Sequence, residues 1–209
     1  MITYLGHSTV LFETDQVRIL IDPGNFSSAW HGLRDLDAIV VTHGHGDHID
    51  PENLPDLLAG NPQAQLIVEP TIPDSIDLPQ AQRLSAGSTL KISSTTIEAV
   101  GGLHAIIHCD IPRIGNVGVM FTTPGEPTLF HPGDALDTAP RGVDILAIPA
   151  HAPWCAMKET IEFVREVDAP QGFLIHDGLI NERGWNLTFH RLGEMTNTHL
   201  ADRRSMEGF

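Results

Sequence analysis

Residues 43–48 place four potential metal ligands within one short segment. The segment reads His-Gly-His-Gly-Asp-His, so it offers three imidazoles and one carboxylate. His43 and His45 are two positions apart, and in extended backbone their side chains point to the same side. The glycines between the histidines let the chain turn sharply without Cβ clashes. Imidazole and carboxylate together suit Zn²⁺ and also Fe, Mn or Ni, so the segment predicts a metal site.

The stretches on either side of this segment favour an ordered site over a solvated His-rich loop. The apolar run Ala38-Ile39-Val40-Val41 is typical of a buried strand, which would carry the cluster to the edge of a sheet. Asp50-Pro51 reads as an N-cap followed by proline at the first helical position. This helix is predicted to be short, because Pro55 interrupts it and Gly60 lies at its end.

Apolar and β-branched runs predict strands along most of the remaining chain. The expected strands cover residues 2–5, 9–12, 17–21, 65–68, 89–92, 95–100, 117–122, 128–130, 145–148 and 172–175. A proline-marked connector is expected after Val68 and runs through Pro79. Further helices are expected over residues 156–167 and near residues 187–200, where apolar side chains recur at helical spacing.

The composition is that of one globular domain spanning residues 1–209. Hydrophobic residues make up 41% of the chain and charged residues 19%. No apolar run approaches the roughly 20 residues of a membrane span, and no secretory signal is seen, so a cytoplasmic location is expected. Cys109 and Cys155 give no disulfide framework and are expected to be at least partly buried.

The chain is strongly acidic, with a formal net charge of −15. Such a charge repels polyanions at long range, which argues against nucleic acid as a partner. A small-molecule substrate is expected instead. The sequence does not indicate an oligomeric state.

Several motifs along the chain match one known family in type and order. Thr42-His43-Gly44-His45-Gly46-Asp47-His48, after a buried strand, resembles the T-H-x-H-x-D-H hallmark of the metallo-β-lactamase superfamily. Supporting motifs are Leu5-Gly6-His7-Ser8, Ile21-Asp22-Pro23-Gly24, Gly101-Gly102-Leu103-His104, His131-Pro132-Gly133-Asp134 and Ile175-His176-Asp177. The early Gly-His-Ser and the short length resemble the bacterial branch that includes sugar-lactone hydrolases. The resemblance implies an α/β fold, a four-layer αββα sandwich with metals at one edge between its sheets.

The resemblance also implies ligands for two divalent metal ions, with zinc expected first and Mn, Fe or Ni as alternatives. One ion would be held by His43, His45 and a third histidine, and Asp134 would bridge the two ions and accept a proton. The remaining ligands of the other ion would be Asp47, His48 and His176. The residues expected to orient these ligands by hydrogen bonds are Asp22, His7 and His131.

The third histidine is either His104 or His108, because both follow the predicted strand at residues 95–100. We favour His104, since it lies closest to the strand end, where the family places this ligand. His108 would then act as a proton donor to the leaving group or serve as a hydrogen-bonded loop residue. The segments 111–113 and 152–154 are expected to form walls of the pocket, with Trp154 packing rather than binding a ligand.

The resemblance implies metal-dependent hydrolysis of a small-molecule ester, lactone or phosphodiester. Two cations roughly 3.5–4 Å apart can hold a bridging water, lower its pKa to about 7 and present hydroxide. Redox di-iron relatives share the sandwich, but they typically carry Glu where His45 stands and are coupled to a flavin domain. A non-catalytic metal-binding module is the second alternative, and the complete set of expected ligands argues against it.

Overall fold

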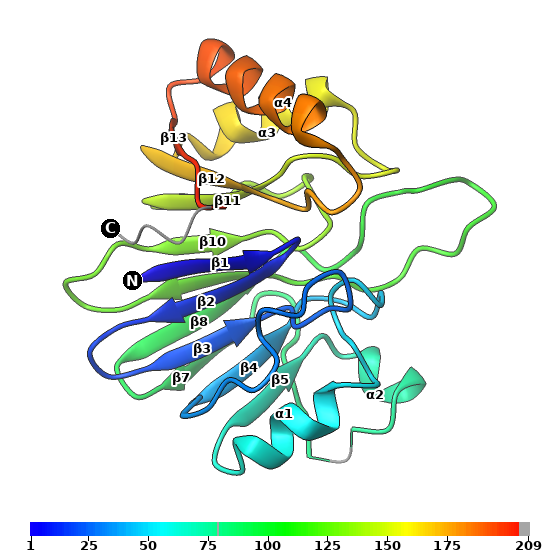
Figure 1. Cartoon of the computed structure of the whole chain (residues 1–209), viewed down its shortest axis with the longest axis vertical. Coiled ribbons are helices and arrows are strands. Elements are labelled where there is room, and N and C mark those ends of the chain that lie inside the picture. Colours follow the sequence, from blue (N-terminus) through cyan, green and yellow to red (C-terminus); the bar gives the residue numbers. More distant parts are fainter. Residues whose placement is uncertain (79, 205–209) are drawn as a thin grey trace.

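Two β-sheets pack face to face, and helices cover the outer face of each sheet (Figure 1). The computed structural model describes residues 1–78 and 80–204. The molecule therefore has four layers in the order helix, sheet, sheet, helix. The αββα sandwich predicted from the sequence is confirmed.

The six-stranded sheet is built from the N-terminal part of the chain. Its strands in spatial order are β1 (Ile2–Gly6), β2 (Thr9–Glu13), β3 (Arg18–Ile21), β4 (Ala38–Val41), β5 (Gln65–Val68) and β6 (Gln82–Arg83). The strands from β1 to β3 are antiparallel neighbours, whereas those from β3 to β6 run parallel. Parallel neighbours need crossover connections, and two of these contain α1 (Leu54–Gly60) and α2 (Ile72–Ser75), which cover the outer face.

The seven-stranded sheet follows the same plan. Its strands in spatial order are β13 (His199–Ala201), β12 (Gln171–Ile175), β11 (Ile145–Pro149), β10 (Leu129–His131), β9 (Gly118–Thr122), β8 (Thr95–Val100) and β7 (Thr89–Ile92). It is antiparallel from β7 to β10 and parallel from β10 to β13. The crossovers contain α3 (Met157–Val167) and α4 (Glu182–Met195), whose apolar sides pack on the outer face.

The inner faces of the two sheets share one apolar core. Ile21 and Val40 from the first sheet and Val119 and Phe173 from the second belong to it. Every residue of β4 and β11 is buried, because these strands have a sheet on one side and helices on the other. The segments that follow β3, β4, β8, β10 and β12 come together at one edge of the sandwich, where the polar residues gather.

The start of α1 differs from the prediction. Pro55 lies in the first turn of the helix rather than interrupting it, because the helix begins at Leu54. Asp50 caps the preceding turn, where its Oδ1 accepts hydrogen bonds from the backbone N–H of Glu52 (3.0 Å) and Asn53 (3.3 Å). The signal at Asp50 therefore marked a turn that leads into the helix.

The last helix also lies earlier in the chain than predicted. The Asn181 side chain accepts a hydrogen bond from the Gly184 backbone N–H (3.1 Å), and this cap starts α4 at Glu182. The helix ends at Met195, and Leu200 belongs to β13, which pairs with β12. The proline-marked connector contains α2, and its predicted end at residue 79 lies outside the described residues. Within 1–78 and 80–204, no helix combines the length and apolar character that crossing a membrane requires.

Candidate metal centre

The turn after β3 lies directly against the His-rich loop after β4. The backbone N–H of Asn25 donates a hydrogen bond to the carbonyl of Gly46 (2.9 Å). Position 24 must be glycine, because a Cβ on Gly24 would lie 1.8 Å from the carbonyl oxygen of Asp47. This close approach brings Asp22, which directly follows β3, within hydrogen-bonding distance of the His-rich loop.

The first ligand group consists of His43, His45, His104 and Asp134. One ligand atom of each residue lies within 4.8 Å of those of the others. The three imidazole rings surround one point, with centroid distances of 4.9, 5.0 and 4.6 Å between their pairs. His45 is partly exposed and the other three residues are buried. Three imidazole nitrogens and one carboxylate oxygen are a donor set that suits zinc.

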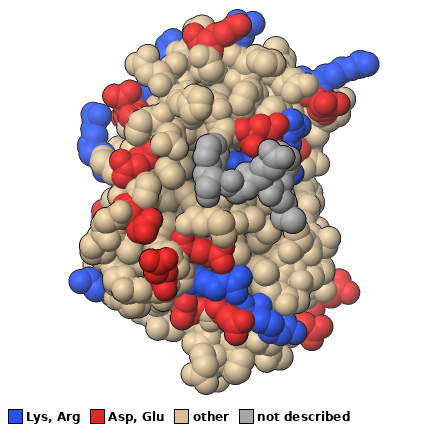
Figure 2. Space-filling model, turned by 60° about the vertical axis from the view of Figure 1, so that its left-hand side comes forward, with Lys and Arg blue, Asp and Glu red and all other residues tan. Residues whose placement is uncertain are grey.

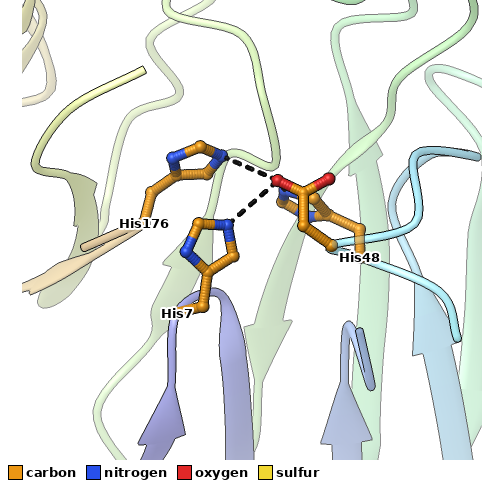
Figure 3. Close-up of side chains that lie close together, drawn as sticks. His7, His48 and His176 are labelled. Carbon is orange, nitrogen blue, oxygen red and sulfur yellow. Dashed lines mark hydrogen bonds and ion pairs between the residues drawn. The ribbon is translucent and has the colours of Figure 1, made fainter. Parts of the chain in front are cut away.

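The second ligand group consists of His7, Asp47, His48 and His176. Figure 3 shows the rings of His7 and His176 pointing toward one carboxylate, which is that of Asp47. The Oδ2 atom of Asp47 lies 3.0 Å from His7 Nε2, 3.5 Å from His176 Nε2 and 3.9 Å from His48 Nε2. The group joins the β1–β2 turn, the loop after β4 and the loop after β12.

Asp134, a member of the first ligand group, also faces the second. Its Oδ2 atom is 3.4 Å from His104 Nε2 in the first group and 3.3 Å from His176 Nε2 in the second. Its Oδ1 atom is 3.1 Å from His48 Nε2. A carboxylate in this place can contribute an oxygen to each group.

Hydrogen bonds to backbone carbonyls fix the ring orientation of two of the histidines. The Nδ1–H of His104 donates to the Ala105 carbonyl (2.7 Å), and that of His176 donates to the His151 carbonyl (2.7 Å). A ring that donates through Nδ1 keeps the lone pair of its Nε2 available for a metal. In both rings Nε2 is the atom that faces the ligand groups.

Asp22 holds one histidine of each group. Its carboxylate accepts hydrogen bonds from His48 Nδ1 (2.7 Å), the Thr42 hydroxyl (2.8 Å) and the Thr42 backbone N–H (2.8 Å). Because the Thr42 hydroxyl donates its hydrogen bond to Asp22, it accepts a hydrogen bond from His43 Nδ1 (3.1 Å). His43 and His48 therefore also present Nε2 lone pairs toward the ligand groups.

Several buried ligand atoms of the two groups have no hydrogen-bond partner. They are His43 Nε2, His104 Nε2, His176 Nε2 and Asp134 Oδ1. Buried polar atoms are nearly always paired, so four unpaired atoms at one place indicate a binding site. A divalent cation accepts lone pairs from this kind of atom. The residues present therefore fit metal ions.

Carboxylates raise the pKa of two histidines of the second group. Although burial disfavours the charged ring, the carboxylates of Asp134 and Asp22 raise the pKa of His48 well above its ordinary value. Against the same effect of burial, the nearby carboxylates of Asp134 and Asp47 raise the pKa of His176 to about 9. A cation that binds the Nε2 lone pair of either ring therefore competes with a proton.

His7 orients Asp47 and has no lone pair left for a metal. Its Nδ1 accepts a hydrogen bond from the Gly178 backbone N–H (3.1 Å), so the ring proton is on Nε2. This Nε2–H donates to Asp47 Oδ2 at 3.0 Å. Both ring nitrogens are therefore used within the protein.

His131 holds the turn that carries Asp134. Its Nε2 donates to the Ser8 carbonyl (2.9 Å), and its Nδ1 accepts the Gly133 backbone N–H (3.2 Å). Gly133 has a φ of 61°, and a Cβ there would lie 2.3 Å from Asn116 Oδ1. The same Asn116 oxygen accepts the backbone N–H of Asp134 (2.9 Å), so the turn fixes Asp134 relative to both groups.

Three residues of the centre adopt left-handed backbone conformations. The φ angles are 52° at His7, 49° at Asp22 and 58° at His176. Non-glycine residues rarely adopt such angles, and they do so mainly where surrounding contacts impose them at functional sites. One such contact is the hydrogen bond from the His176 backbone N–H to the His7 carbonyl (2.7 Å).

His108 lies outside both ligand groups, because the loop after β8 continues outward beyond His104 (Figure 1). Its side chain is 59% exposed, and its Nδ1 accepts a hydrogen bond from the Asp110 backbone N–H (3.1 Å). The leaving-group role predicted for His108 has no supporting contact and stays a prediction. The adjacent Cys109 is exposed, so its expected partial burial is wrong.

Trp154 belongs to the centre, although the sequence indicated only a packing role. Its indole N–H donates a hydrogen bond to Asp134 Oδ2 (2.9 Å). Its ring centroid lies 5.9 Å from that of His104 and 6.2 Å from that of His176. No sequence signal could have found this contact, since the two partners lie 20 positions apart in different loops.

Comparison with protein families assigns the chain. Residues 1–172 match the family model of the beta-lactamase superfamily domain. The chain belongs to the metallo-β-lactamase superfamily. The superfamily match covers the first ligand group completely, and of the second group only His176 lies beyond it.

Relatives within the superfamily include Protein Rv0786c of Mycobacterium tuberculosis, which is 39% identical over 198 residues, or 94% of this chain and 93% of that protein. A UPF0173 metal-dependent hydrolase of Brucella ovis is 31% identical over 151 residues, covering 64% of this chain and 61% of that protein. The metallo-beta-lactamase fold protein YhfI from Bacillus subtilis superposes with a TM-score of 0.73 at 14% identity, covering 96% of this chain and 94% of that one. At that identity the likeness to YhfI shows the fold alone.

Proposed function

We propose that the chain is a binuclear metal-dependent hydrolase that cleaves a small, neutral ester or lactone. The observation that carries the proposal is the convergence of four buried, unpaired ligand atoms between the two ligand groups. Asp47 and His45 are only partly buried, so the centre has a side that a substrate can reach. The name of the Brucella relative, a metal-dependent hydrolase, supports the same chemistry.

The two groups divide the ligands between two cations in this proposal. The first group would hold one cation, and Asp47, His48 and His176 would hold the other, with Asp134 reaching both. Zinc suits this mixture of imidazole and carboxylate, and Mn, Fe or Ni are alternatives. His7 takes no direct part, because its nitrogens already bind Gly178 and Asp47.

Bound divalent cations would supply an acidified water and an electrophile for the scissile group. The protein's own part is to keep the ligands in place and to move a proton. Asp134 Oδ1 faces His48 Nε2 at 3.1 Å and keeps a second lone pair, which could take up the proton of the attacking water. Asn116 and Trp154 hold Asp134 in position while it does so.

The segments that carry the centre lack free positive charges for an anionic substrate. Lys and Arg are absent from residues 1–17, 35–82, 142–157 and 166–182. The single Lys or Arg of residues 92–140 is Arg113, which donates to the His104 carbonyl and pairs with Asp137 at 2.9 Å. Anionic substrates are usually held by Arg or Lys, so a neutral ester or lactone fits better than a phosphodiester.

Surface charge also favours a small substrate over nucleic acid. On the face that Figure 2 shows, Lys and Arg side chains are interspersed with Asp and Glu. The chain as a whole has a net charge of −15. Nucleic-acid binding requires a basic surface that neutralises phosphates, and these charges do not favour it.

Metal analysis combined with a substrate panel tests the proposal. The protein is stripped with a chelator, reloaded with Zn, Mn, Fe or Ni, and assayed on 4-nitrophenyl acetate, γ-butyrolactone and bis(4-nitrophenyl) phosphate. We expect two metal equivalents per chain and metal-dependent turnover that is faster on the ester or lactone than on the phosphodiester.

Three other outcomes would contradict the proposal. A protein that takes up no transition metal would have no metal centre. Tight metal binding without turnover on the whole panel would indicate a non-catalytic module. A redox-active di-iron spectrum under anaerobic conditions, again without hydrolysis, would indicate a redox protein.

A further inference from the structure

The loop between β11 and α3 makes two separate contacts with the metal centre. The carbonyl of His151 accepts the Nδ1–H of His176 (2.7 Å), and the indole N–H of Trp154 donates to Asp134 Oδ2 (2.9 Å). The loop is closed on itself by a hydrogen bond from the Cys155 backbone N–H to the Ala152 carbonyl (3.1 Å). One short loop therefore positions a histidine of the second group and the carboxylate shared by both groups.

We propose that Trp154 is a positioning residue that divides the two oxygens of Asp134 between the two cations. This inference rests on the binuclear centre proposed above. A carboxylate has about four lone-pair sites, two on each oxygen. The indole N–H occupies one site of Oδ2, so this oxygen keeps one site and cannot serve two cations in the carboxylate plane.

The position of Asp134 alone does not divide its oxygens between the groups. Oδ2 lies 3.4 Å from His104 Nε2 in the first group and 3.3 Å from His176 Nε2 in the second, whereas Oδ1 lies 3.1 Å from His48 Nε2 in the second group. With Oδ2 restricted by Trp154, Asp134 gives Oδ2 to one cation and Oδ1 to the other. Loss of the indole N–H would free Oδ2 to rotate or to take both cations itself.

Variants that differ only in the donor test this role. Trp154→Phe keeps an aromatic ring and removes the N–H, whereas Trp154→Gln keeps an N–H donor three bonds from Cβ, as in the indole. Trp185→Phe is the matched control, because Trp185 packs on Phe189 within α4, with ring centroids 4.7 Å apart. All variants are first compared with the wild type by circular dichroism in the metal-free state.

Metal binding, rather than turnover, is the readout. Zn²⁺ affinity is measured by competition with a chromophoric chelator, and the visible spectrum is recorded for protein loaded with Co²⁺. We expect Trp154→Phe to weaken at least one of the two equivalents about 10- to 100-fold and to change the Co²⁺ spectrum. Trp154→Gln should recover part of the affinity, and Trp185→Phe should match the wild type.

The proposal is overturned if Trp154→Phe keeps the affinity and spectrum of the wild type, or if Trp154→Gln and Trp154→Phe lose affinity equally. Should Trp154→Phe fail to fold, the Zn²⁺ affinity of Trp154→Gln is compared with that of Trp185→Phe instead. The Gln amide is then the group that replaces the lost indole donor at position 154. Failure of the hydrolase proposal is separate. It would appear as a wild type that binds two metals and hydrolyses nothing, which leaves this measurement interpretable.

Discussion

The fold holds the carboxylates of the two ligand groups in different ways. Asp134 is 3% exposed, and its backbone N–H, its turn and its side chain are each held by hydrogen bonds. Asp47 is 19% exposed and lies in a glycine-flanked loop, where the His7 ring holds it. The carboxylate of the first group is therefore more completely positioned before a metal arrives, although each group has one partly exposed member, His45 in the first and Asp47 in the second.

This difference predicts different metal affinities and different access to substrate for the two groups. A carboxylate that is held in place before the cation arrives contributes more to its affinity, because less is lost in ordering the side chain. A partly exposed carboxylate contributes less and leaves room for substrate. We expect the first group to take the tighter metal equivalent and the second to lie on the substrate side.

The strongest test removes the one residue that belongs to both groups. Asp134→Ala should lower turnover on the order of 1000-fold and weaken both metal equivalents, because each cation loses an oxygen and the proton acceptor is gone. Metal content and kcat/KM are the measurements, and Asp110→Ala, an exposed carboxylate outside the centre, is the control. Two tightly held metals in Asp134→Ala would show that this residue does not bridge.

The second test separates two histidines of one loop. His104→Ala should abolish the tighter metal equivalent and reduce turnover by about 100-fold or more, because the first group loses a buried ligand. His108→Ala should bind metal like the wild type, since its side chain points to solvent. Metal titration followed by calorimetry distinguishes the variants. Loss of metal in His108→Ala but not in His104→Ala would reverse the assignment.

A third test addresses the second group alone. Asp47→Ala should reduce the metal content from two equivalents to one and lower hydrolysis sharply, while the fold and the first equivalent remain. His48→Ala should act in the same direction. The readouts are metal content, thermal unfolding of the metal-free protein and turnover. Full turnover in both variants would rule out a two-metal mechanism.

The smallest effect is expected where a residue only orients a ligand. His7→Asn removes the donor to Asp47 Oδ2 while keeping a residue that tolerates the left-handed backbone at position 7. The looser metal equivalent should weaken about 10-fold, and the tighter one should not change. An equal loss at both equivalents would mean that His7 supports the whole centre rather than one carboxylate.

The sequence predicted the parts of the molecule that local pattern determines. The parallel strands β4 and β11 are continuous apolar runs because both of their faces are buried, and such runs are visible without a structure. The candidate ligands within residues 43–48 form one contiguous motif, and the remaining candidate ligands follow strand ends that could be located. The superfamily resemblance then ordered these pieces into two groups.

The sequence could not predict contacts that depend on how separate loops are positioned relative to each other in the folded protein. Trp154 reaches Asp134, and Gly178 reaches His7 from 171 positions away, and neither contact leaves a local pattern. His104 and His108 were separable only by the direction in which the loop after β8 continues. The start of α4 was missed because the cap at Asn181 precedes the apolar periodicity on which the prediction relied.

Asp22 links the two ligand groups, and this link would affect how the two cations bind. It accepts a hydrogen bond directly from His48 of one group and, through the Thr42 hydroxyl, is linked to His43 of the other. Filling either group stiffens this shared acceptor and so reduces the ordering that remains for the other. Occupancy of the two groups should therefore be thermodynamically coupled, with the same coupling free energy in whichever order they fill.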